Sequence, residues 1–137
     1  MGVHIGNDYH HKCRCQNYDD PEANIIRVTK GDTVDLQVPI EIWDTEAEEW
    51  VEFVPSEGDT LRFALKGSAT DTRPIMTVDI PIETQNLRIE ADETETLRAR
   101  REPYWYDIEL TVNKPDGKVN KDTIIEWTQF YVTEEAD

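Results

Sequence analysis

Apolar residues recur at every second position along most of this chain, and this alternation limits the folds open to it. In the stretch GDTVDLQVPIEI the apolar residues are Val34, Leu36, Val38, Ile40 and Ile42, and polar residues or proline stand between them. A spacing of two places successive side chains on opposite faces of an extended strand. The pattern therefore predicts a half-buried strand with one face toward a core and one toward water.

The same alternation returns in later segments that are separated by turn-forming residues. These segments are TLRFALK (60–66), IMTVDIPIE (75–83) and YWYDIELTV (104–112). Seven to nine short strands at roughly 8–12-residue spacing are typical of an antiparallel β-sandwich. We therefore predict an all-β fold that is Ig-like in the loose sense, because the cysteine and tryptophan spacing of antibody domains is missing. At most one short helix is expected, between Asp92 and Pro103, where acidic residues precede basic ones.

Pro39 interrupts the first of these strands. Proline has no N–H to donate to a neighbouring strand. The strand around Pro39 is therefore expected at a sheet edge, or bulged at that position.

The last strand, TIIEWTQFYV (123–132), does not keep a single phase. Simple alternation places Ile124, Phe130 and Val132 on one face, and Ile125, Trp127 and Tyr131 on the other. The segment NKPDGK before it supplies a tight turn, so the last two strands are predicted to form a hairpin.

The acidic segment DTEAEE (44–49) lies between Trp43 and Trp50. A polar segment between two apolar stretches predicts a hairpin loop. The two tryptophans are then expected to form a cross-strand pair.

Charge excludes two classes of partner. The chain has 14 basic and 30 acidic residues, and its formal net charge is −16. Such a charge repels phosphate backbones and anionic lipids, so we expect neither nucleic acid nor a membrane as partner. The first residues, MGVHIGNDYHHKCRC, lack the apolar core of a signal peptide, which predicts a soluble protein made and folded in a reducing cytoplasm.

Residues 1–22 are predicted to form a polar N-terminal arm, and residues 23–137 the β-sandwich domain. The arm contains His10, His11, Cys13 and Cys15, which are all competent zinc ligands. Their spacing matches no usual structural zinc motif, so a metal-binding arm and a solvated arm both stay open. We predict no resident metal and no other cofactor.

The predicted domain offers little for catalysis. All three histidines lie in the arm, and Ser56 and Ser68 stand in loops and not in a nucleophile elbow. No acidic residue stands in a sequence context that would clearly raise its pKa. We therefore predict that the protein is not an enzyme.

Aromatic residues on the second face of the C-terminal hairpin are the main candidates for a binding surface. Trp105 and Trp127 lie opposite to the apolar series of their strands, and antiparallel pairing would bring them near each other. Asp107 and Tyr131 share that face. Aromatic side chains on a nominally wet face indicate either a partner or a covering segment of the same chain.

These motifs resemble small β-sandwich domains of tailed-phage and prophage structural proteins, in particular the N-terminal domains of baseplate upper and receptor-binding tail proteins. The resemblance spans Ile25–Thr133, and Y-x-Y-D-I with a downstream D-G and T-I is its most specific part. The matching residues are Gly31, Asp32, Gly58, Asp59, Thr94, Leu97, Tyr104, Tyr106, Asp107, Ile108, Asp116, Gly117, Thr123, Phe130 and Val132. The chain departs from the pattern where Trp127 stands near a frequent glycine, and where RREP precedes Tyr104.

The resemblance implies an assembly role without catalytic residues. We therefore expect a non-enzymatic docking module of a phage or prophage virion, in the tail or baseplate. Its partners would be other virion proteins or further copies of itself, in an oligomer. The alternative is a ligand-binding β-sandwich, such as a carbohydrate-binding module that uses exposed aromatic residues.

Overall fold

The computed structural model describes residues 13–15, 21–113 and 116–134, and most of these residues lie in strands. The strands are β1 (Cys13–Cys15), β2 (Ile26–Thr29), β3 (Val34–Gln37), β4 (Ile40–Asp44), β5 (Glu49–Glu52), β6 (Thr60–Lys66), β7 (Met76–Ile80), β8 (Asn86–Ile89), β9 (Tyr104–Asn113) and β10 (Val119–Thr133). A 3-10 turn, η1 (Pro21–Asn24), and a single helical turn, α2 (Ala91–Thr94), complete the described elements. The predicted all-β fold with one short helix is confirmed.

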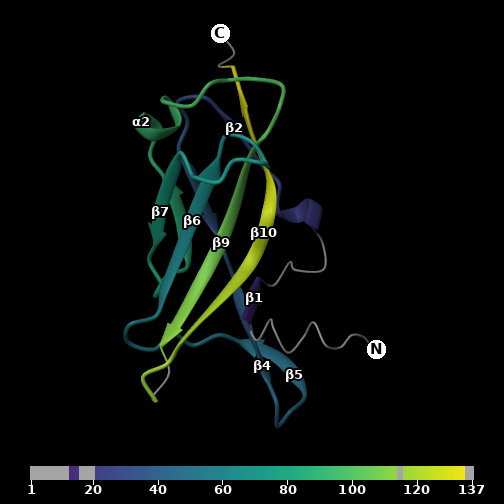
Figure 1. Cartoon of the computed structure of the whole chain (residues 1–137), viewed down its shortest axis with the longest axis vertical. Helices are drawn as coiled ribbons and strands as arrows, with labels where there is room; N and C mark the ends of the chain where they lie inside the picture. Colours follow the sequence, from purple (N-terminus) through teal and green to yellow (C-terminus); the bar gives the residue numbers. More distant parts are fainter. Residues whose placement is uncertain (1–12, 16–20, 114–115, 135–137) are drawn as a thin grey trace.

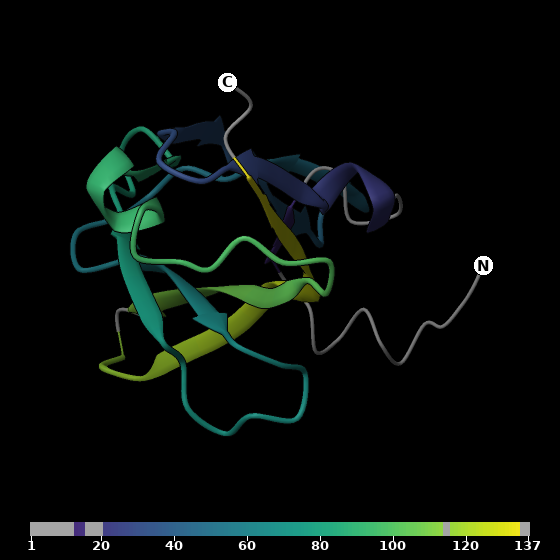
Figure 2. The same ribbon diagram turned by 90° about the horizontal axis from the view of Figure 1, so that it is seen from above.

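The strands form two layers (Figure 1). One layer is a five-stranded sheet in the order β2-β10-β9-β6-β7. The other layer consists of a three-stranded sheet, β1-β4-β5, and a two-stranded sheet, β3-β8. From above, β6, β7 and β9 lie apart from the blue strands β3 and β4, and the long yellow strand β10 runs from one layer toward the other (Figure 2). This is a β-sandwich, as the alternation predicts.

All strand pairs among the described residues are antiparallel except β2 with β10. In this pair Phe130 lies opposite Ile26, and Thr133 lies opposite Thr29. Parallel neighbours need a long connection, and β2 and β10 lie near opposite ends of the chain. Sequence alternation does not distinguish parallel from antiparallel pairing, so this exception was not predicted.

Aromatic rings fill the middle of the core. Phe63 from β6 stacks on Tyr106 from β9 with ring centres 5.3 Å apart, and Phe130 from β10 lies 6.1 Å from Phe63. All three side chains are at most 2% exposed. The hydroxyl group of Tyr106 donates a hydrogen bond to the backbone carbonyl of Asn24, which ties η1 to the sheet.

The segment between α2 and β9 is irregular and is held by Tyr104. The Tyr104 hydroxyl group accepts a hydrogen bond from the Arg98 N–H (2.9 Å) and donates one to the Arg98 carbonyl (3.1 Å). These bonds replace a helical continuation, so the helix expected within 92–103 shrinks to α2. None of the helices in the described part of the chain is long and apolar enough to span a membrane.

Pro39 divides the segment that alternation suggests as one strand. β3 pairs with β8, whereas β4 pairs with β1 and β5, so the two halves belong to different sheets. Before the proline, the Val38 N–H donates to the Gln85 carbonyl at 2.8 Å, outside regular pairing. The edge position or bulge expected at Pro39 is instead a break between two sheets, and the expectation of a single continuous strand from Val34 to Ile42 is wrong.

β10 contains two register shifts, and they explain its mixed phase. Thr123 lies opposite Glu109, Ile125 opposite Ile108, and Thr128 opposite Tyr106, so β10 has one extra residue in each interval. Each bulge reverses the face of the residues that follow it. The expectation that Ile125 shares the outer face with Trp127 is therefore wrong, because Ile125 is only 6% exposed and belongs to the core.

Part of the expected N-terminal arm belongs to the sandwich. β1 pairs with β4, with Cys13 opposite Ile42 and Cys15 opposite Ile40. Cys13 is 2% exposed and contributes to the core, which the polar composition of residues 1–22 did not predict. The other metal candidates of the arm, His10 and His11, lie outside the described residues.

Candidate functional site

The two aromatic groups singled out in the sequence occupy different places. Trp43 and Trp50 lie opposite each other in the β4–β5 hairpin, with ring centres 5.5 Å apart in an edge-to-face arrangement. The predicted cross-strand pair is confirmed. The Arg14 guanidinium group lies 4.0 Å from the centre of the Trp50 ring. These contacts stabilise the hairpin itself, although Trp43 stays 36% exposed.

The second group lies on the outer face of the five-stranded sheet. Trp105 in β9 is half-buried and lies opposite Lys66 in β6, whose ammonium group is 3.9 Å from the centre of the Trp127 ring. Lys66 thus links the two tryptophans, and Trp127 remains 38% exposed. We call the surface formed by Lys66, Trp105, Asp107 and Trp127 the Trp face.

Asp107 lies in the middle of the Trp face. It is opposite Ala64 in β6, and on the β10 side it faces the bulge that contains Trp127. Desolvation by burial, and then the negative charge of Glu109, raise the pKa of Asp107 from 3.8 to about 6, although Lys66 and Arg62 act in the opposite direction. The expectation that no acidic residue has surroundings that raise its pKa is wrong here.

Tyr131 belongs to a different part of the surface from the Trp face. It lies opposite Arg27 in β2, and the Arg27 guanidinium group is 4.6 Å from the centre of its ring. The two side chains border an open hollow of about 460 Å³ that we call the Arg hollow. Residues that line it include Arg27, Ala99, Arg100, Arg101, Tyr131 and Glu134.

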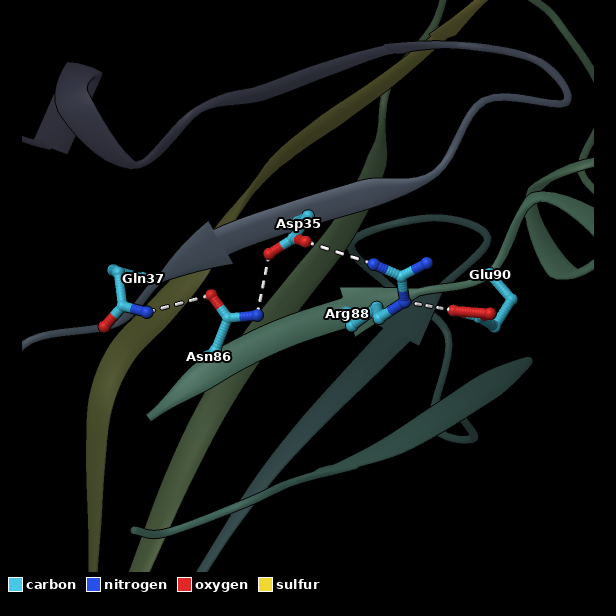
Figure 3. Close-up of polar contacts among 5 residues, drawn as sticks. All are labelled: Asp35, Gln37, Asn86, Arg88 and Glu90. Atoms are coloured by element: carbon cyan, nitrogen blue, oxygen red, sulfur yellow. Dashed lines mark hydrogen bonds and ion pairs between the residues drawn. The ribbon is translucent and has the colours of Figure 1, made fainter. Parts of the chain in front are cut away.

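The outer face of the β3–β8 sheet is occupied by a polar network (Figure 3). Asn86 accepts a hydrogen bond from Gln37 (3.0 Å) and donates one to Asp35 (2.7 Å). Arg88 forms ion pairs with Asp35 (3.1 Å) and with Glu90. The hydrogen bond to Glu90, and then the negative charge of Glu90, raise the pKa of Arg88. These side chains are exposed but bonded to one another, unlike the aromatic rings of the Trp face.

The described residues contain no group of three or more His, Cys, Asp or Glu side chains that could hold a metal ion. The sandwich itself contains no histidine, because all three precede residue 12.

Lys66 and the three arginines of the Arg hollow were missed as candidate binding residues. Lys66 stands on the polar side of an alternating strand, where a solvated lysine is the ordinary expectation. Two of these arginines, Arg100 and Arg101, could have been suspected from LRARRE (97–102), which gathers basic residues in a strongly acidic chain.

No protein-family model matches the sequence, and the search of curated proteins gives no match. The function is therefore argued from the surfaces described above and from the sequence motifs.

Proposed function

We propose that this protein is a non-enzymatic docking module of a phage or prophage virion, in the tail or baseplate, that acts through protein–protein contacts. The observation that carries the docking role is the Trp face, where the exposed Trp127 ring lies beside a half-buried aspartate. Tryptophan is enriched at the energetic centres of protein interfaces. The assignment to a virion rests on the sequence resemblance described above.

A second copy of the chain is the partner that best fits the charges around this face. Arg62 and Lys66 in β6 lie beside Asp107 and Glu109 in β9, so both signs alternate across neighbouring strands. A two-fold contact brings the same patch of two copies together, and a patch with both signs is able to complement itself. A stable contact of this kind would bury about 800 Å² on each copy.

Lys66 also argues against the alternative of a carbohydrate-binding sandwich. Sugar recognition by this face would use exposed ring surfaces, but the Lys66 ammonium group covers one side of the Trp127 ring at 3.9 Å. A cation on an aromatic ring is a stabilising contact. A sugar that stacks on that side of the Trp127 ring would have to displace the Lys66 ammonium group, and the loss of this contact would weaken binding.

Light scattering on wild type and Trp127→Ala tests the proposal. Wild type is expected to form an oligomer, and the substitution should raise the concentration needed for association at least about tenfold, because a hot-spot tryptophan is lost. Val54→Ala is the control, because Val54 is 79% exposed and lies in the connection between β5 and β6, outside the Trp face. Equal association of wild type and Trp127→Ala, or monomers in both samples, would contradict docking through the Trp face to a second copy.

A further inference from the structure

The Arg hollow is a basic site in an acidic chain. Its lining includes Arg27, Arg100 and Arg101, against one acidic residue, Glu134, among the lining residues that the structure describes. The whole chain has a formal net charge of −16. Three guanidinium groups around one hollow therefore create a local field opposite in sign to that of the molecule.

Two arginines of the hollow, Arg27 and Arg100, are held in place without carboxylate partners, and Arg101 is exposed at its border. Arg100 donates hydrogen bonds to the carbonyl groups of Gly67, Glu102 and Pro103, and its guanidinium group lies 3.8 Å from the Tyr104 ring centre. Arg27 stacks on Tyr131. Within the described part of the chain, no ion pair involves Arg27, Arg100 or Arg101. The charges of Arg27 and Arg100 are thus positioned, and none of the three is neutralised by an ion pair in the described residues, which favours an anionic occupant.

The matching acidic element is the tip of the β4–β5 hairpin. The Asp44 carboxylate accepts hydrogen bonds from the backbone N–H groups of Glu46 (3.0 Å) and Ala47 (3.2 Å), so the turn has a defined shape. The side chains of Glu46, Glu48 and Glu49 are exposed at this turn. A tip that is ordered before binding loses less entropy when it docks.

The hairpin and the hollow lie at opposite ends of the molecule. In Figure 1 the β4–β5 hairpin projects at the lower end, whereas β10 ends near the C-terminus at the upper end, where the hollow is formed. A chain cannot place its own hairpin in its own hollow across this distance. Contact between the two surfaces therefore requires two copies.

We propose that the β4–β5 hairpin tip of one copy docks in the Arg hollow of the next, so that copies of this chain associate head to tail. Such a contact joins two different surfaces, and its repetition gives a ring or a filament. At about 0.15 M salt the Debye length is about 8 Å, so the repulsion between the net charges of two copies is screened and the local pairing decides. This contact is separate from the Trp face and does not depend on it.

A charge-exchange experiment tests the proposal by light scattering at about 0.15 M NaCl, over a series of protein concentrations. The first variant combines Arg27→Glu with Arg101→Glu, and the second combines Glu46→Lys with Glu49→Lys. Each variant alone brings like charges together at the contact, so both are expected to lose head-to-tail association and to keep only docking through the Trp face. In an equimolar mixture each hollow meets a hairpin of opposite charge, so association should return.

Three further samples make the result specific. Arg73→Glu with Lys121→Glu makes the same charge change at exposed positions outside the hollow and should associate like wild type. If the acidic replacements prevent folding, the neutral variant with Arg27→Gln and Arg101→Gln replaces them. It should raise the concentration needed for head-to-tail association at least about tenfold. The exchange is repeated in a Trp127→Ala background, where restored association would show that the head-to-tail contact acts without the Trp face.

The proposal would be overturned if the single variant Trp127→Ala, in which the hollow and the hairpin are unchanged, stays monomeric. It would also be overturned if the variant with Arg27→Glu and Arg101→Glu associates like wild type. The same holds if this variant and the variant with Glu46→Lys and Glu49→Lys are both folded but their mixture fails to associate. None of these outcomes depends on whether Trp127→Ala alone weakens docking through the Trp face.

Discussion

Tyr104, Trp105 and Tyr106 are adjacent in sequence, but each has a different role. The Tyr106 ring packs against Phe63 in the core, and the Tyr104 hydroxyl group holds the backbone of Arg98. Trp105 points to the other side of β9 and joins the Trp face. Alternation predicts which of the three side chains are buried. It does not predict the carbonyl groups that the hydroxyls reach, because these lie in irregular segments.

Asp107 provides a prediction at the scale of one residue. Its pKa of about 6 in the folded protein is above the ordinary value of 3.8, so ionisation is harder in the folded than in the unfolded state. The charged carboxylate therefore lowers the free energy of unfolding at pH 7. As the pH falls through 6, the folded carboxyl group is protonated, and this penalty disappears toward pH 4.

Asp107→Asn should consequently raise the free energy of unfolding at pH 7 by roughly 1 kcal/mol. A two-unit pKa difference corresponds to about 3 kcal/mol in a buried site, and partial exposure reduces it. Urea unfolding of wild type and variant at pH 7 and pH 4 measures the effect, and the difference between the two proteins should be much smaller at pH 4 than at pH 7. Asp79→Asn, at an exposed position in β7, is the control. A variant that is less stable at pH 7 would show that Asp107 has a stabilising partner when charged.

At the scale of the strand, the bulges of β10 make a prediction that simple alternation would reverse. Ile125 lies opposite Ile108 and is 6% exposed. Ile125→Ala should therefore lower the free energy of unfolding by about 2–5 kcal/mol, as for other buried isoleucines. Ile75→Ala is the matched control, since Ile75 is 55% exposed and should change stability by less than about 0.5 kcal/mol. Equal, small effects at both positions would place Ile125 outside the core and remove the first bulge.

Strand positions were predictable where the alternation is regular, and less so where a proline or a bulge interrupts the regular strand. Residues 60–66 and 104–113 form β6 and β9 as expected. At Pro39 the missing N–H indicated an edge strand or a bulge. It did not indicate that the segments before and after the proline would belong to different sheets. In the sequence, a bulge is visible only as a shift in the alternation of apolar and polar residues. The adjacent apolar residues Ile124 and Ile125 were the sign of the first bulge. β1 carries three residues, too few for a periodic pattern to be recognised.

At the scale of the molecule, the candidate surfaces were only partly visible in the sequence. Trp105 and Trp127 were expected on one face because they belong to adjacent strands of a hairpin, and the structure places both beside Lys66. The Arg hollow joins β2, the segment before β9 and the end of β10. The parallel β2–β10 pair brings the two strands together, and the hydrogen bond from the Arg100 N–H to the Val132 carbonyl (3.1 Å) adds the segment before β9. Sequence patterns describe single segments, so they do not predict a surface such as the Arg hollow, which three distant segments form.

The net charge of −16 gives a prediction for the whole molecule. Like charges on a folded surface repel one another, and added salt screens this repulsion. Raising NaCl from about 10 mM to about 200 mM at pH 7 should therefore increase the free energy of unfolding, measured by urea unfolding with tryptophan fluorescence. Isolated surface ion pairs such as Arg88–Asp35 act in the opposite direction but contribute little.

The same salt series near the isoelectric point separates screening from other effects of salt. The sequence pI is about 4.4, so at that pH the net charge and its self-repulsion are close to zero. The stabilisation by NaCl should then be much smaller than at pH 7. Trp127→Ala leaves the net charge unchanged, so at low protein concentration it should show the same salt response as wild type. Equal stabilisation at both pH values would mean that salt acts through something other than charge repulsion, and that the acidic surface does not limit the stability of this fold.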